Sequence, residues 1–128
     1  MTDVRDVVVI GAGPAGGAAA IGLADRGRRV ALVDRERFPR DKVCGGCLNP
    51  RAIRSLAALG VVPSGVPLRW LVLHAGGRTA RVPLEGGLAV SRRSLDAALV
   101  DAARARGVEV IEGVAATLGP DGGDARAI

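Results

Sequence analysis

The chain has 128 residues, of which 48% are hydrophobic, so it can form one domain with a real core but is short for an enzyme that binds both a large cofactor and a substrate. Its formal net charge is +5, supplied almost wholly by arginine, since Lys42 is the only lysine. The arginines are scattered, and Phe38 and Trp70 are the only aromatic residues, which excludes the usual footprint of a nucleic-acid-binding protein.

The first 34 residues predict a βαβ unit. Residues 7–10 are a continuous apolar run, typical of a central parallel strand that is buried on both faces. A glycine-containing turn leads into a predicted helix from residue 14 to about residue 26, with Gly27 as its C-cap. A second buried strand then covers residues 30–33 and ends at Asp34.

The uncharged stretch from residue 7 to residue 24 could be mistaken for a membrane span or a signal peptide. It contains five glycines and Pro14, which suit neither, and the residues before it include acidic ones. The two cysteines, Cys44 and Cys47, do not indicate a secreted disulfide scaffold. We therefore expect a cytoplasmic, soluble protein without a stable membrane span.

Residues 35–48 read as an irregular loop. A helix is predicted from Pro50, capped by Asn49 and ending at Gly60, and its apolar face combines Ile53, Leu56 and Ala57. Two short apolar runs, 70–74 and 79–84, flank a Gly-Gly pair and predict a β-hairpin.

Another short strand is predicted at residues 88–90, and Ser91 is a good N-cap for a helix over residues 92–106. This helix is expected to turn Leu95, Leu99 and Ala102 toward the core. A strand at 108–111 follows, and then a hairpin of residues 114–118 and 125–128 around a turn at 120–124. The second strand of that hairpin has no room to finish. The predicted fold is α/β, with a parallel sheet and an added β-hairpin, cut off inside a domain.

The turn after the first strand is a G-x-G-x-x-G sequence made of Gly11, Ala12, Gly13, Pro14, Ala15 and Gly16. The first glycine permits the tight turn, the second lets a pyrophosphate approach the backbone, and the third lets helix and strand pack closely. The N–H groups at the start of the helix then favour the anion. This pattern predicts a Rossmann-type site for the pyrophosphate of a dinucleotide.

Asp34 strengthens this interpretation. It ends the next strand, at roughly the 20-residue distance expected for a carboxylate that binds the adenosine ribose. The plainer alternative is that Asp34 only caps the end of the strand. The fingerprint alone does not distinguish NAD from FAD.

Residues 35–46 read R-E-R-F-P-R-D-K-V-C-G-G, and this run resembles the geranylgeranyl reductase family of FAD-dependent oxidoreductases. That family belongs with the p-hydroxybenzoate hydroxylase-type flavoproteins, which include flavin monooxygenases and halogenases. Residues 92–96, R-R-S-L-D, resemble the family's R-x-x-F-D, with Leu95 in place of the usual Phe. Asp34 stands where the family usually has Glu.

The resemblance implies FAD as the cofactor. It places Arg92 on the FAD phosphates or ribityl chain, the backbone of Val114 against the adenine, and Cys44 to Gly46 near the isoalloxazine. The alternative for Arg92 is a surface arginine at a helix end. The implied cofactor-binding set is Gly11, Ala12, Gly13, Pro14, Ala15, Gly16, Asp34, Arg35, Arg40, Lys42, Cys44, Gly45, Gly46, Arg92 and Val114.

The implied activity is an oxidation or reduction of a small organic or isoprenoid substrate, with NAD(P)H as electron donor. Reductase and monooxygenase both remain open. The resemblance makes residues 1–128 the N-terminal part of an FAD/NAD(P)-binding domain without its substrate domain, so the chain alone is expected to be inactive. Two alternatives stay open: a pyridine-nucleotide disulfide reductase using Cys44 and Cys47, and a non-catalytic nucleotide-binding fragment. The two cysteines make no metal site without further ligands, and His74 reads as structural.

Overall fold

The computed structural model describes residues 4–120. The predicted strand at 125–128 and nearly all of the turn before it lie outside the described residues. Within residues 4–120, no helix combines the length and the apolar character needed to cross a bilayer.

A three-stranded parallel sheet forms the centre of the fold, in the order β1-β2-β8. Strand β2 (Val30–Asp34) is buried along its whole length between β1 (Val7–Ile10) and β8 (Glu109–Glu112). The predicted α/β class with a parallel sheet is confirmed. The prediction that residues 7–10 form a central strand is wrong for the described residues, because β1 pairs only with β2 there and Ile10 remains 51% exposed.

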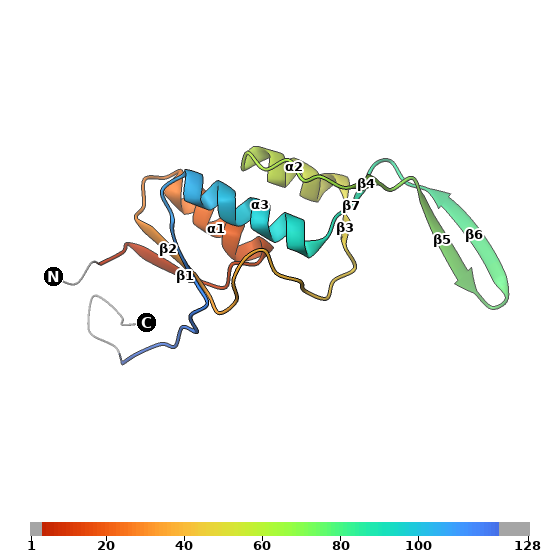
Figure 1. Ribbon diagram of the computed structural model, residues 1–128. Helices are drawn as coiled ribbons and strands as arrows, with labels where there is room; N and C mark the ends of the chain where they lie inside the picture. Colours follow the sequence, from red (N-terminus) through yellow and green to blue (C-terminus); the bar gives the residue numbers. More distant parts are fainter. Residues whose placement is uncertain (1–3, 121–128) are drawn as a thin grey trace.

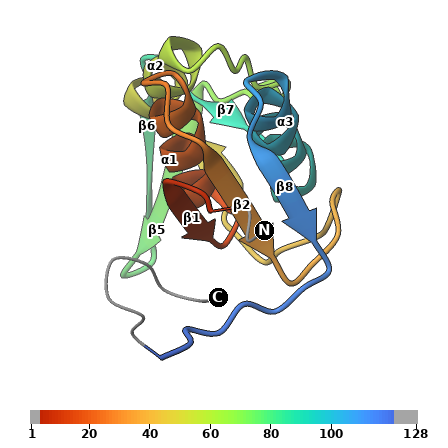
Figure 2. The same cartoon turned by 90° about the vertical axis from the view of Figure 1, so that its left-hand side faces the viewer.

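Two helices, α1 (Pro14–Ala24) and α3 (Arg92–Ala105), lie side by side and cover one face of this sheet (Figures 1 and 2). Gly17 faces Leu99, and a β-carbon on it would lie 3.1 Å from the Leu99 Cβ, so the small residue lets the helices approach closely. Helix α3 buries Leu95, Leu99 and Ala103. Ala102 also packs against this core, as expected, but it is only partly buried, and the fully buried residue at this end of α3 is Ala103.

A smaller unit lies at the other end of α3 (Figure 1). Helix α2 (Pro50–Ala58) begins as predicted, with Asn49 Oδ1 accepting a 2.8 Å hydrogen bond from Ala52 N. Of the predicted apolar face of α2, only Leu56 is fully buried. Three short strands pair antiparallel beside it: β3 (Cys47–Leu48), β7 (Leu88–Ala89) and β4 (Val66–Pro67). The predicted loop 35–48 therefore ends in a strand, because its last two residues find a partner in β7.

The predicted hairpin is confirmed as β5 (Trp70–Ala75) and β6 (Arg78–Pro83), paired in antiparallel register. Both strands are exposed along their length, and the hairpin projects away from the rest of the chain (Figure 1). His74 lies in it, with Nδ1 2.9 Å from Thr79 Oγ1 on the opposite strand. This contact is consistent with a structural histidine.

Residues 113–120 form no regular strand, so the strand predicted at 114–118 is wrong. The backbone there turns back to the end of β2 instead. Val114 N donates to Asp34 O at 3.2 Å, and Gly113 N donates to Glu36 O at 3.1 Å. These bonds place Val114 next to the carboxyl end of the parallel sheet.

Candidate functional site

The glycine loop and the start of α1 are closely packed, and no side chain caps the helix. Gly11 has a φ of 98°, which favours glycine, and its N–H donates to Val33 O at 2.8 Å. A β-carbon on Gly16 would overlap the carbonyl oxygen of Gly11, so only glycine fits between strand and helix. The N-cap residue Gly13 offers no side chain to the first N–H groups of α1, and no acidic residue occupies the first turn. Those N–H groups and the helix dipole favour an anionic group.

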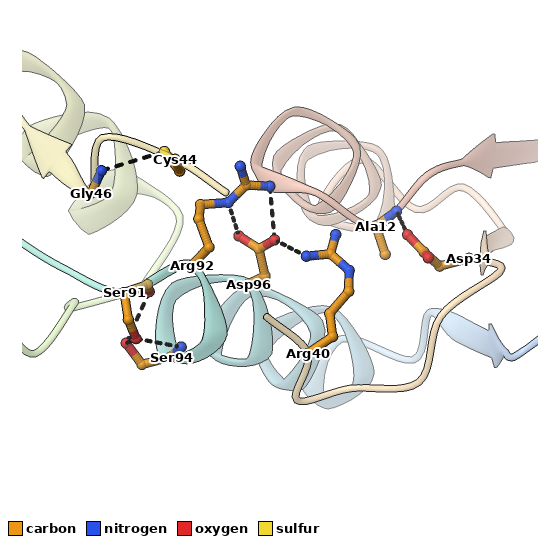
Figure 3. A network of polar contacts seen from close by, with 9 residues as sticks. All are labelled: Ala12, Asp34, Arg40, Cys44, Gly46, Ser91, Arg92, Ser94 and Asp96. Carbon is orange, nitrogen blue, oxygen red and sulfur yellow. Dashed lines mark hydrogen bonds and ion pairs between the residues drawn. The ribbon is translucent and has the colours of Figure 1, made fainter. Parts of the chain in front are cut away.

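Asp34 ties the end of β2 to this loop. Its Oδ2 accepts a 2.7 Å hydrogen bond from Ala12 N, and its Oδ1 accepts one of 2.9 Å from Glu36 N (Figure 3). The side chain is buried, with the residue 8% exposed. An ionised carboxylate has about four acceptor positions, so these two bonds leave capacity for a ribose hydroxyl. The bond to Ala12 has no signal in the sequence, because it depends on where two distant turns meet.

Many of the predicted site residues surround one cavity of about 640 Å³ at the carboxyl end of β2. Ligands of open α/β sheets bind at this edge of the strands. The predicted residues that line it are Gly11, Asp34, Arg35, Arg40, Lys42 and Val114. The structure thus brings together residues from three separate stretches of the chain around one cavity.

A second cavity, of about 430 Å³, adjoins the first, because Asp41 and Lys42 line both. Cys44, Gly46 and Arg92 line it, which are the residues expected toward the isoalloxazine and the phosphates. The remaining predicted residues, Ala12, Gly13, Pro14, Ala15, Gly16 and Gly45, line neither cavity. Apart from Gly45 they belong to the turn before α1 and to its first residues.

Between the two cavities lies a buried ionic group that we call the arginine–aspartate cluster: Arg40, Arg92 and Asp96. Asp96 accepts from Arg92 Nε and Nη2 at 2.8 and 2.9 Å and from Arg40 Nη1 at 2.8 Å (Figure 3). Its side chain is 0% exposed. The Asp96 hydrogen bonds raise the pKa of Arg92 above its ordinary value. The expectation for Arg92 did not foresee this partner, although Asp96 lies four residues away on the same helix.

The two thiols, Cys44 and Cys47, have different polar partners. Gly46 N donates to Cys44 Sγ at 3.5 Å, and this bond, followed by the Arg92 side chain, lowers the pKa of Cys44 below its ordinary value. Cys47 Sγ instead donates to Gly45 O at 3.3 Å. Both cysteines are free and exposed. Each thiol thus has its own backbone partner and the two are not bonded to each other.

We predict that Cys44 and Cys47 do not cycle between thiol and disulfide during turnover. Thiol titration of the complete protein under non-reducing conditions, before and after reduction by its electron donor, should give the same number of thiols. A Cys47→Ser variant should retain activity. Two thiols that appear only on reduction, together with loss of activity in Cys47→Ser, would favour the disulfide reductase instead.

The glycine loop, the carboxylate at the end of β2 and the cleft at the carboxyl edge define a dinucleotide-binding α/β domain of the Rossmann type. The family model described as "FAD binding domain" matches residues 4–126. The chain therefore belongs to the FAD-binding domain family, and this membership supports FAD as its cofactor.

Relatives and solved structures agree with this assignment. The chain is 47% identical over 85 residues to menaquinone reductase of Mycobacterium tuberculosis (strain ATCC 25618 / H37Rv), covering 66% of this chain and 19% of the relative. It is 33% identical over 120 residues to geranylgeranyl diphosphate reductase of Rhodobacter capsulatus, covering 92% of this chain and 30% of the relative. The myxobacterial chondrochloren halogenase has the same fold, with a TM-score of 0.78 and 28% identity, over 88% of this chain and 29% of that one. The chain thus spans less than a third of the length of each of these proteins.

Proposed function

We propose that this chain is the cofactor-binding region of an FAD-dependent reductase that acts on a compound with an isoprenoid chain. The observation that carries the proposal is the 47% identity to a menaquinone reductase over 85 residues. The similarity to a geranylgeranyl diphosphate reductase, which extends over 92% of the chain, supports the same substrate class and the resemblance of residues 35–46 to that family.

The described residues fit the ADP half of FAD. The N–H groups at the start of α1 bind the pyrophosphate, together with Arg92, which lies against Gly13. Asp34 accepts from a ribose hydroxyl, and the backbone at Val114 faces the adenine, beside the cavity that both residues line. Cys44 to Gly46 lie toward the isoalloxazine. When bound, FAD supplies the electron-transfer chemistry, and the protein supplies binding and orientation.

The electron donor in this proposal is NAD(P)H, and the protein works in the cytoplasm. The low cysteine content supports that compartment. Oxygenation of an organic substrate is the main competing activity, because the chain is also 39% identical over 63 residues to squalene epoxidase ERG1 of Saccharomyces cerevisiae. The two activities differ in one measurable way, since a monooxygenase consumes oxygen in step with product and a reductase does not.

The complete protein, purified, should be yellow, with the absorbance bands of an oxidised flavin. Heating should release FAD, identified by chromatography against FMN and riboflavin standards, in about one equivalent per chain. The reason is that the glycine loop and Asp34 form a site for the ADP half, which FMN and riboflavin lack. A colourless protein that binds NAD tightly would contradict the FAD assignment.

The substrate class is tested under anaerobic conditions with NADPH, the purified protein and a quinone that carries an unsaturated isoprenoid side chain. A reductase should add two hydrogens to the substrate, seen by mass spectrometry, while oxidising an equal amount of NADPH. Product that forms only in air, with oxygen consumption, would favour the monooxygenase.

A further inference from the structure

We propose that Asp96 is a positioning residue for the pyrophosphate of the cofactor, acting through Arg92 and Arg40. The inference rests on the proposed FAD-binding function and adds a specific role that Asp96 plays in it.

The placement of the cluster supports this role. Arg40 lines the cavity at the end of β2, and Arg92 lines the adjoining cavity beside Cys44. The Asp96 carboxylate holds one arginine in each, through hydrogen bonds of 2.8 to 2.9 Å (Figure 3). The pyrophosphate of FAD joins the adenosine half to the riboflavin half. The junction of the two cavities is therefore where its negative charge belongs.

Arg92 also contacts the predicted phosphate loop directly. A β-carbon on Gly13 would lie 3.4 Å from Arg92 Nη2, so the guanidinium lies against the N-cap of α1. A guanidinium has five N–H donors, and the bonds to Asp96 use two of them on Arg92. Other donors of Arg92 remain available, and Arg92 lines the cavity beside Cys44.

The charge of the cluster points to an anion. Two guanidinium groups and one carboxylate leave a net charge of about +1 in a place where the side chains of Asp96, Arg40 and Arg92 are 0%, 9% and 16% exposed. Buried charges are retained when they are paired, and here the pairing is incomplete by one unit. A pyrophosphate against this group and the start of α1 would supply the missing negative charge.

Arg40 is also held from a second side. Its guanidinium lies 4.7 Å from the centre of the Phe38 ring, and Phe38 N donates to Glu112 Oε1 at 2.8 Å. Preformed donors bind an anion better than mobile ones because less ordering is required on binding. Asp96 therefore contributes to affinity by fixing two long, flexible side chains.

The test is Asp96→Asn in the complete protein. The amide has nearly the same shape, but its NH₂ group must face an arginine N–H on one side, so the two guanidinium groups cannot both stay in place. Affinities for FAD and for riboflavin, which lacks both the pyrophosphate and the adenosine, are measured by flavin fluorescence. We expect FAD to bind at least ~10-fold more weakly, with riboflavin affinity unchanged within about twofold.

Asp101→Asn is the matched control, because Asp101 lies on the same helix and pairs with Arg104 at an exposed position. It should change neither affinity. Tighter FAD binding in Asp96→Asn would show that the carboxylate only neutralises the arginines. Equally weaker binding of FAD and riboflavin would show a general loss of structure. Either result overturns the inference. A wild-type protein without FAD affinity would overturn the proposed function itself, whereas FAD binding that Asp96→Asn leaves intact overturns only the role of Asp96.

Should Asp96→Asn fail to fold, Arg40→Met is compared with Arg40→Met/Asp96→Asn, in which one charge of each sign has been removed. If Asp96 positions Arg92, the double variant should bind FAD more weakly than Arg40→Met, with riboflavin unaffected. Equal FAD affinities in the two variants would overturn the inference.

Discussion

Replacing Gly16 by alanine is expected to abolish stable FAD binding by the complete protein. The added β-carbon would overlap the carbonyl oxygen of Gly11 and would also crowd Val9 Cγ1 at 3.4 Å. The main obstacle is backbone, so no side-chain rotation relieves it, and α1 must move away from β1. Overpacking of this kind costs about 1–3 kcal/mol or more. It also displaces the N–H groups that face the pyrophosphate.

Thermal melting measures the loss of stability, and retention of FAD after gel filtration measures the loss of cofactor binding. Gly22→Ala is the matched control in the same helix, since its β-carbon would meet only the flexible end of Arg26, at 3.4 Å. That variant should keep its FAD and gain stability of roughly 0.5–1 kcal/mol, the usual gain from removing a glycine inside a helix. A Gly16→Ala protein that melts and binds FAD like wild type would contradict the described packing of α1 on β1.

Asp34→Ala is expected to weaken FAD binding by about ten- to a hundredfold. A hydrogen bond to a charged group contributes roughly 1.5–3 kcal/mol, and the carboxylate would lose its ribose partner. The same change removes the bonds to Ala12 N and Glu36 N, so the glycine loop loses its tie to the end of β2. Asp34→Glu should be tolerated, because glutamate keeps the charge and reaches a ribose.

An FAD analogue with a 2′-deoxyadenosine group separates the two roles of Asp34. If the carboxylate binds the ribose, the wild type should prefer FAD to the analogue, and Asp34→Ala should bind both equally. If Asp34 only fixes the loop, the variant should bind FAD and the analogue more weakly than the wild type, by the same factor for both. Unchanged FAD affinity in Asp34→Ala would contradict both roles.

The local features of the chain could be predicted because neighbouring residues determine them. The apolar runs at β1 and β2 and the glycine turn of G-x-G-x-x-G predicted the parallel βαβ unit, and the Gly-Gly pair predicted the hairpin β5–β6. Asn49 and Ser91 were recognised as helix caps, since capping depends on bonds within three residues. The resemblance of residues 35–46 identified FAD, and the family match is consistent with it.

Errors arose where an assignment depended on a distant partner. Residues 7–10 are as apolar as residues 30–33, yet β2 has neighbours on both sides and β1 only on one, within residues 4–120. Residues 113–114 turn back to the end of β2, where a strand over residues 114–118 was predicted. In each case, the periodicity of the sequence shows which side chains are apolar, but it does not show which other segment the backbone pairs with.

The sequence by itself determined the class of the protein: a glycine loop after a buried strand, an acid after the next one, and arginines placed near both. Only the tertiary structure decided how these residues act together. Ala12 and Asp34 are 22 residues apart and Arg40 and Asp96 are 56 apart, yet each pair is joined by a hydrogen bond of 2.7 or 2.8 Å. The physical reason is that packing α1 and α3 on one face of the sheet brings both loops to its carboxyl edge, where Asp96 is buried and must be paired.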